Sequence, residues 1–199
     1  MDERHDTRPV AGIFWMVVTG LLFVGVTALV KYMGPRIPAA EAAFLRYAIG
    51  LILLIPMIRP IVKAHLSKRL WVLFGARGLV HTFGVALWFF AMARIPIADV
   101  TSMGYLAPIY VTIGAALFLG EKLALRRIVA VALALVGAVI ILRPGFREVG
   151  PGHLAMLAAA LFFAASYLLA KQVSDATDPV VVVTMLSITV AIGLAPMAI

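Results

Sequence analysis

Long apolar runs dominate this chain, and short charged or Pro/Gly-rich joints interrupt them every 20 to 30 residues. An α-helix rises 1.5 Å per residue, so about 20 apolar residues cross the hydrocarbon core of a bilayer. Seven such runs fit into the 199 residues, at about 11–33, 38–58, 70–93, 96–119, 124–142, 153–171 and 179–199. The sequence therefore predicts an all-α, polytopic transmembrane helix bundle of about seven spans.

The composition agrees with a membrane chain. Apolar residues make up 64% of it and charged residues 13%, whereas a soluble domain carries about a quarter charged residues. A net charge of +8 would suggest nucleic acid in a soluble protein, but the Lys and Arg residues gather in the joints. We therefore expect the lipid bilayer, and not nucleic acid, as the partner. Cysteine is absent, which excludes disulfides and Cys-based metal sites.

The distribution of positive charge predicts the orientation. Alternate joints carry ten Lys and Arg residues when counted from the N-terminus, against five in the other set. Cytoplasmic loops hold the excess of positive charge in membrane proteins. We therefore expect residues 1–10 to be a cytoplasmic N-terminus, and the chain to lie in a bacterial inner membrane.

The sequence also contains a weak internal repeat. Residues 12–59 align without gaps on 152–199 at an offset of 140. The informative matches are Gly12 with Gly152, Lys31 with Lys171, and Pro56-Met57 with Pro196-Met197. A five-helix unit followed by a copy enters the membrane from opposite sides, as in inverted-repeat transporters with a midplane substrate site.

Several motifs resemble the EamA domain of the drug/metabolite transporter superfamily. They are Phe44-Leu45-Arg46-Tyr47, the stretch 91–99 (AMARIPIAD), Tyr105-Leu106-Ala107-Pro108, Leu119-Gly120-Glu121, Arg126-Arg127, and Leu142-Arg143-Pro144-Gly145. The resemblance covers residues 11–143 as a first repeat of five transmembrane helices. After a joint at 144–151, residues 152–199 resemble the first two helices of a second repeat.

The resemblance implies ten spans in two repeats, with both termini cytoplasmic. Seven spans leave the second copy of the inverted repeat incomplete. We therefore expect either an apparently truncated piece of a longer protein or, if seven spans are the full product, a chain that completes itself as a homodimer.

Polar residues within spans are costly and are candidates for function. Arg46 lies near the middle of the second span, and His81 falls at a similar depth in the third. Together they would suit an anionic or carboxylate-bearing substrate. The alternative is structural: Arg46 and Arg77 bond to carbonyls or to Glu41. For Arg77, one turn before His81, we expect snorkelling to the cytoplasmic surface.

His81 and Glu41 are candidates for proton coupling. Histidine titrates near neutral pH, and a carboxylate in apolar surroundings exchanges protons closer to neutrality than an exposed one. Glu41 and Asp99 both lie shallowly at the start of a span, so a helix-end role is the competing interpretation.

The fourth span contains Pro108, which removes a backbone donor near the bilayer centre. Carbonyls freed there are tolerated where they line a cavity or are buried in protein. Trp88, Tyr105 and Pro108 are therefore predicted to line a substrate pocket, or else to form a packing kink. Ala130, Ala134 and Ala138 form a small-residue stripe that predicts a helix contact.

The sequence carries no nucleophile elbow, P-loop or dinucleotide fingerprint, and its four histidines are scattered. We expect no enzyme, no cofactor and no metal site. The predicted function is transport of a small organic metabolite, an amino acid or related compound, by alternating access and in the direction of export. The alternatives are uptake of a vitamin-like or nucleoside-like metabolite, and a truncated, non-transporting membrane scaffold.

Overall fold

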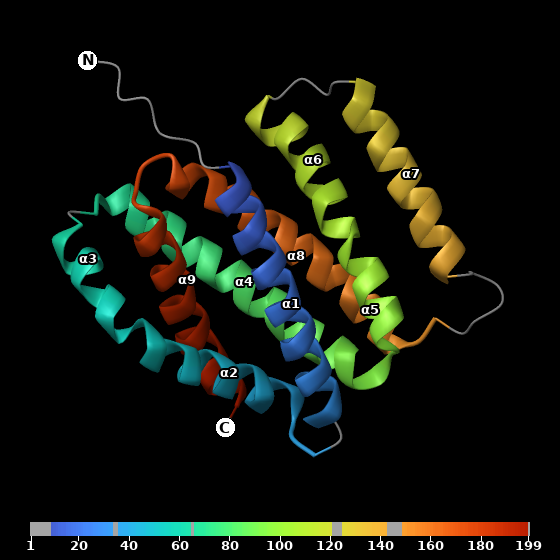
Figure 1. The fold of residues 1–199 in the computed structure, drawn as a ribbon, viewed down its shortest axis with the longest axis horizontal. Coiled ribbons are helices and arrows are strands. Elements are labelled where there is room, and N and C mark those ends of the chain that lie inside the picture. The colour runs from blue at the N-terminus through green and yellow to red at the C-terminus, as the bar shows by residue number, and fades with distance from the viewer. Residues whose placement is uncertain (1–8, 34–35, 65, 121–124, 143–148, 199) are drawn as a thin grey trace.

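The computed structural model describes residues 9–33, 36–64, 66–120, 125–142 and 149–198, which form helices joined by short turns (Figure 1). In chain order the α-helices are α1 (Pro9–Met33), α2 (Ala39–Leu54), α3 (Ile58–Lys63), α4 (Lys68–Arg94), α5 (Ile97–Gly104), α6 (Leu106–Leu119), α7 (Leu125–Leu142), α8 (Pro151–Ser174) and α9 (Pro179–Leu194). Two 3₁₀ turns, η1 (Ile55–Met57) and η2 (Ala195–Met197), follow α2 and α9. The predicted all-α, polytopic bundle is confirmed.

Six helical stretches of the described chain are long and apolar enough to cross a membrane: Val10–Tyr32, Ala39–Val62, Lys68–Arg94, Ile97–Phe118, Pro151–Ser174 and Pro179–Met197. They coincide with six of the seven predicted runs. The remaining run, 124–142, corresponds to the 18-residue helix α7. Arg126 and Arg127 are the second and third residues of this helix.

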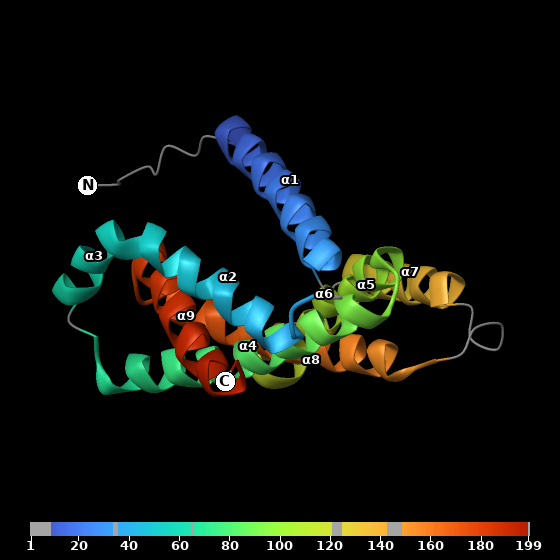
Figure 2. The ribbon, with the colours of Figure 1, turned by 90° about the horizontal axis from the view of Figure 1, so that it is seen from below.

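The internal repeat reappears in the helix boundaries. Shifting α2 and η1 by 140 residues gives the bounds of α9 and η2. Both 3₁₀ turns contain the Pro-Met pair, because proline lacks the N–H that would continue the α-helical ladder. In Figures 1 and 2, α1 and α8 run in opposite senses, as an inverted repeat requires.

Helix α4 forms the centre of the bundle and packs chiefly against α8 and α9. Ser67 begins α4 by accepting a hydrogen bond from the Leu70 N–H, and Asp178 begins α9 by accepting one from the Val180 N–H. Glycine permits the close approach: a Cβ atom at Gly78 would overlap the Thr189 side chain of α9. The same helices are joined by a reciprocal contact, in which Gly193 of α9 faces Thr82 of α4.

Helix α1 stands apart from the bundle along most of its length (Figure 2). Its first turns expose large apolar side chains, whereas Val30 near its end is buried in the core cluster that includes Trp88. A membrane supplies an apolar environment for such a face. The molecule therefore has a tight α4–α8–α9 centre and a loosely attached first helix.

The fourth predicted span is two helices rather than one. Helix α5 ends at Gly104 and α6 begins at Leu106. Pro108 explains the position of the break, because it cannot donate to the carbonyl four residues earlier, at Gly104. The predicted domain division at 144–151 stays a prediction, since residues 143–148 lie outside the described part, as do residues 1–8 of the predicted N-terminal segment.

Candidate substrate site between the helices

A group of polar side chains gathers near the middle of the membrane-spanning helices. We call it the mid-depth cluster; its members are Arg46, Tyr47, Arg77, His81, Ser166 and Tyr167. His81 is at the centre of the 27-residue α4, and Arg46 is at the centre of the 16-residue α2. The cluster therefore joins α2 and α4 of the first predicted repeat to α8 of the second, and Arg77 also bonds to the Val182 carbonyl of α9.

His81 contacts α8 directly. Its Nδ1 atom lies 3.0 Å from the Ser166 Oγ, and its ring centroid is 5.1 Å from that of Phe163. Ser166 is fully buried and His81 is half-buried. Arg46 and Arg77 both act electrostatically on the His81 imidazole. Arg46 therefore lies within electrostatic range of His81, and a substrate role for either residue stays a prediction.

Arg46 itself is exposed, and its guanidinium lies 5.0 Å from the centroid of the Tyr47 ring. Neither Glu41 nor any other described carboxylate forms an ion pair with it. The structural alternative of an Arg46–Glu41 bond is thus not seen, and Glu41 lies half-buried in the first turn of α2. Whether Arg46 binds substrate and whether Glu41 or His81 couples protons stay predictions.

Arg77 does not snorkel, contrary to the expectation. Its side chain is 7% exposed, and its Nη1 donates a 3.1 Å hydrogen bond to the carbonyl of Val182 in α9. Its Nε is buried without a hydrogen-bond partner among the described residues. The snorkelling expectation was wrong because it considered depth along α4 alone, whereas α9 covers this face. The bond to a backbone carbonyl is the structural alternative that the sequence had left open for Arg77.

Trp88, Tyr105 and Pro108 do not form one pocket. Trp88 is 6% exposed, and its ring stacks on Phe23 of α1 at a centroid distance of 5.6 Å. Tyr105, 68% exposed, lies at the α5–α6 break. Together with Pro108 it lines a separate cavity of about 460 Å³ that Trp88 does not line.

That cavity separates α7 from the α5–α6 break. Ala130 and Ala134 of the small-residue stripe line its opposite wall, with Arg127 among the lining residues. Ala134 also packs against the buried Ala107 group of α6. The stripe therefore faces α6, as a helix-contact surface should, but part of it borders an open space. Ala138 lies outside the described side chains.

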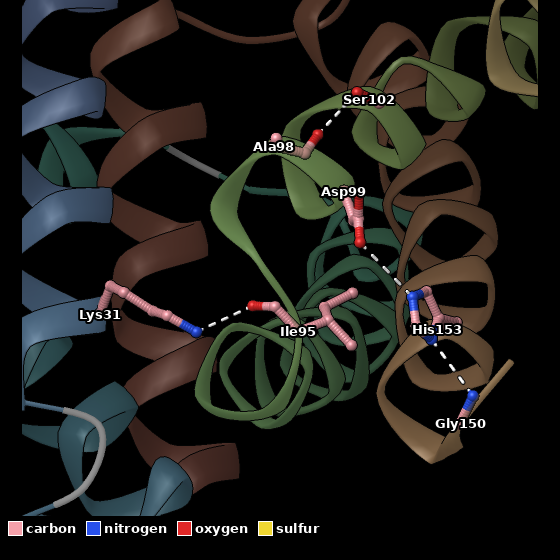
Figure 3. Close-up of polar contacts among 7 residues, drawn as sticks. All are labelled: Lys31, Ile95, Ala98, Asp99, Ser102, Gly150 and His153. Atoms are coloured by element: carbon pink, nitrogen blue, oxygen red, sulfur yellow. Dashed lines mark hydrogen bonds and ion pairs between the residues drawn. The ribbon is translucent and has the colours of Figure 1, made fainter. Parts of the chain in front are cut away.

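A second polar region, which we call the end clamp, lies where α1, α4, α5 and α8 meet (Figure 3). It consists of Lys31, the carbonyls of Met92 and Ile95, Asp99 and His153. The Lys31 Nζ donates to the Met92 and Ile95 carbonyls at 2.9 and 2.8 Å. These carbonyls end α4, where intrahelical donors run out and a cation is favoured.

The other half of the end clamp joins α5 to α8. Asp99 is 4% exposed, and its Oδ2 lies 3.6 Å from the His153 Nε2. The Gly150 N–H donates to the His153 Nδ1 at 3.2 Å, so the ring proton faces Asp99 (Figure 3). Asp99 lies in the first turn of α5, and its helix-end role stays a prediction. Lys31 was singled out in the sequence only as a match of the internal repeat, which did not predict its contact with α4.

Among the described residues no group of three or more His, Cys, Asp or Glu side chains could hold a metal ion.

The six long apolar helical stretches make the described chain a multi-pass membrane protein, and a positively charged cluster lies between its helices. Residues 10–143 match the EamA-like transporter family, and the chain belongs to that family. The resemblance inferred from the sequence is confirmed.

The chain is similar to several curated proteins. The riboflavin transporter of Vibrio cholerae is 29% identical over 95% of this chain and 65% of its own length. The pseudopaline exporter CntI of Pseudomonas aeruginosa is 29% identical over 82% of this chain and 58% of its own length. The S-adenosylmethionine uptake transporter of Rickettsia bellii is 29% identical over 77% of this chain and 53% of its own length. No solved structure matches.

The chain therefore spans about half to two thirds of the length of the curated relatives that it matches. These relatives are named as transporters and not as enzymes. The family and the multi-pass architecture are shown for this chain, whereas substrate and direction differ among the relatives.

Proposed function

We propose that this chain moves a small organic metabolite across the bacterial inner membrane by alternating access, with its N-terminus in the cytoplasm. The observation that carries the proposal is the mid-depth cluster, in which polar residues from both predicted repeats meet within apolar helices. Intramembrane ionisable residues that face a bundle interior typically mark substrate or ion pathways. Family membership supports the same function.

The end clamp and the loose helix α1 suggest how access alternates. The end clamp holds α1, α4, α5 and α8 together at one end, whereas the start of α1 stands apart at the other (Figure 2). With the N-terminus in the cytoplasm, the clamped end is the periplasmic one. We propose that this conformation is closed towards the periplasm.

The similar proteins differ in the direction of transport that their names state. One relative is named an exporter and another an uptake transporter. Export of an amino acid or related compound is our first proposal. Uptake of a vitamin-like or nucleoside-like metabolite is the second candidate, and similarity to transporters named for riboflavin and S-adenosylmethionine favours it.

Transport in proteoliposomes tests the proposal. The purified chain is reconstituted, and the entry of radiolabelled amino acids, riboflavin and S-adenosylmethionine is compared with entry into protein-free vesicles. We expect at least one solute to enter by a saturable route that Arg46→Ala abolishes at equal protein incorporation. Arg94→Ala is the matched control, because Arg94 is exposed and its guanidinium contacts Phe90 of its own helix.

Two outcomes would contradict the proposal. Background transport for every solute, together with a reproducibly co-purifying protein, would favour the membrane scaffold. Equal loss of inserted protein and transport in Arg46→Ala would assign Arg46 a structural role.

A further inference from the structure

Arg77 is a buried cation whose hydrogen bonding is incomplete. The side chain is 93% buried, Nη1 donates to the Val182 carbonyl, and Nε has no partner among the described residues. A guanidinium is always charged in proteins, and leaving one of its donors unpaired in an apolar interior is costly. Most buried polar groups in folded proteins have a partner, so this donor needs an explanation.

The surroundings of Arg77 add positive charge instead of neutralising it. Arg46 lies in the same cluster, and no described carboxylate forms an ion pair with either arginine. The buried carboxylate Asp99 faces His153 in the end clamp. Tyr47 and Tyr167, which interact electrostatically with Arg77, are neutral hydroxyl groups that can donate hydrogen bonds. The cluster therefore offers several donors and a net positive charge.

The unpaired donor also has a specific shape. In a guanidinium, Nε and Nη2 lie on one edge, whose two parallel N–H groups match the two oxygens of a carboxylate or phosphate. The Val182 carbonyl occupies Nη1 and leaves this edge to another ligand. Tyr167, which acts electrostatically on Arg77, and Arg46 are both exposed, so the cluster has an accessible side.

We infer that Arg77 binds the oxyanion group of the transported metabolite through its Nε edge, and that Arg46 attracts the same anion. The substrate is then a small organic anion carrying a carboxylate or a phosphate. This inference rests on the proposed function for its reference to transport. The binding step is testable without any transport.

The test measures ligand-induced thermal stabilisation of the full chain in lipid nanodiscs. The probes are succinate, its neutral isostere succinamide, and inorganic phosphate at constant ionic strength. We expect saturable stabilisation by succinate or phosphate and none by succinamide. The stronger of the two anions identifies the oxyanion. Arg77→Lys keeps the charge but loses the two-pronged edge, so anion affinity should fall about tenfold, equivalent to about 1.4 kcal/mol.

Arg77→Gln removes the charge and should abolish anion binding, whereas Arg94→Gln, on the exposed end of the same helix, should bind like the wild type. If Arg77→Gln does not fold, Arg77→Lys and the comparison of succinate with succinamide still decide. Equal effects of succinate and succinamide, no effect of either anion, or unchanged binding in Arg77→Lys would overturn the inference and assign the Nε site to a water molecule.

The two proposals fail separately. Anion binding that depends on Arg77, without transport of any solute, would support the inference and contradict the transport function. Saturable transport of neutral or cationic solutes only, with no anion binding, would leave the transport function standing and overturn the inference.

Discussion

The end clamp and the mid-depth cluster are both polar regions of an apolar bundle, but they satisfy their polar groups differently. In the end clamp, Lys31 donates to two carbonyls that end α4, and Asp99 faces the ring proton of His153. In the mid-depth cluster, two arginines act on the His81 imidazole without an ion pair to a described carboxylate, and the Arg77 Nε has no partner among the described residues.

The polar groups of the end clamp stabilise the fold, whereas those of the mid-depth cluster are available to bind a ligand. A helix end has backbone groups without intrahelical partners, so a charge placed there completes the fold. Mid-helix backbone groups are already paired within their helices, and the single backbone bond of Arg77, from Nη1 to the Val182 carbonyl, leaves Nε available for other contacts. Variants in the end clamp should therefore change stability, and variants in the mid-depth cluster should change binding.

The largest expected effect comes from Gly78→Leu, which would disrupt the close contact between α4 and α9 beside the mid-depth cluster. A side chain at position 78 would overlap Thr189, so α9 would move away from α4 and separate Val182 from Arg77. Adding a large side chain to a closely packed contact typically lowers the free energy of unfolding by about 1–3 kcal/mol and occasionally by more, and we expect the upper part of that range here. Thermal unfolding in nanodiscs should show a large loss of stability and of folded yield.

Gly75→Leu is the matched control, because a Cβ atom at Gly75 meets nothing within 4 Å. It lies one turn earlier on α4 and should leave folding unchanged. Equal stability of the two variants would show that α4 and α9 do not approach each other at Gly78.

The second prediction concerns the α5–α8 half of the end clamp. Asp99→Ala and His153→Ala should each lower the free energy of unfolding by about 2 kcal/mol, because each leaves a buried polar partner unsatisfied. The double variant should lose less than the sum of the two single losses, since both substitutions remove the Asp99–His153 contact, whereas His153→Ala alone also removes the hydrogen bond from the Gly150 N–H. Urea or thermal unfolding of all three proteins measures the coupling.

Asp175→Ala, at the exposed opposite end of α8, is the control and should be nearly neutral. Fully additive losses for Asp99→Ala and His153→Ala would contradict a direct contact between the two side chains. If Asp99→Ala lost anion binding without losing stability, Asp99 would be assigned to the substrate site and not to the end clamp.

How well the sequence predicted these regions depends on whether a feature is local. The spans follow from apolar length, and the 140-residue offset predicted the shared bounds of α2 and α9, because both are properties of a continuous segment. The kink near Pro108 was likewise predictable, although its position at Gly104 needed the hydrogen-bond rule for proline. The depth of Arg46 and His81 along their helices placed them in one cluster.

The rest depends on how helices rotate and pack, which hydropathy does not determine. Arg77 was expected to snorkel, but α9, more than 100 residues later, covers it and accepts its hydrogen bond. Trp88 was grouped with Tyr105, yet it stacks on Phe23 of α1. Lys31 was predicted only as a repeat position, yet it donates to the carbonyls at the end of α4. Each of these contacts joins segments far apart in the sequence.

The third prediction concerns the attachment of α1. Lys31→Met keeps a long side chain but removes both hydrogen bonds to α4, at a cost of about 1–2 kcal/mol at most for bonds between membrane helices. Because the start of α1 stands apart from the bundle, loss of these bonds should make the end of α1 more mobile. The chain has no cysteine, so a spin label at Leu29→Cys reports on this helix alone.

The label should show faster motion in the Lys31→Met background and unchanged motion with Lys68→Met, which alters an exposed lysine at the start of α4. Unchanged mobility in Lys31→Met would mean that the apolar contact of Phe23 with Trp88 is sufficient to hold α1.

The smallest expected effect is in the mid-depth cluster itself. Ser166→Ala removes the partner of the His81 Nδ1, and hydrogen bonds between membrane helices contribute about 0.6 kcal/mol on average, or roughly threefold in an equilibrium constant. If the mid-depth cluster serves a ligand, the loss should appear in anion affinity or in the KM for transport, because His81 is no longer held in one orientation. If it serves the fold, the same loss should appear in the melting temperature with KM unchanged.

Ser187→Ala is the control for a general effect of removing a hydroxyl, since the Ser187 hydroxyl donates to the Val183 carbonyl of its own helix. A change in stability alone, in Ser166→Ala but not in Ser187→Ala, would place His81 with the end clamp as a packing contact and leave Arg46 and Arg77 as the remaining candidates for substrate binding.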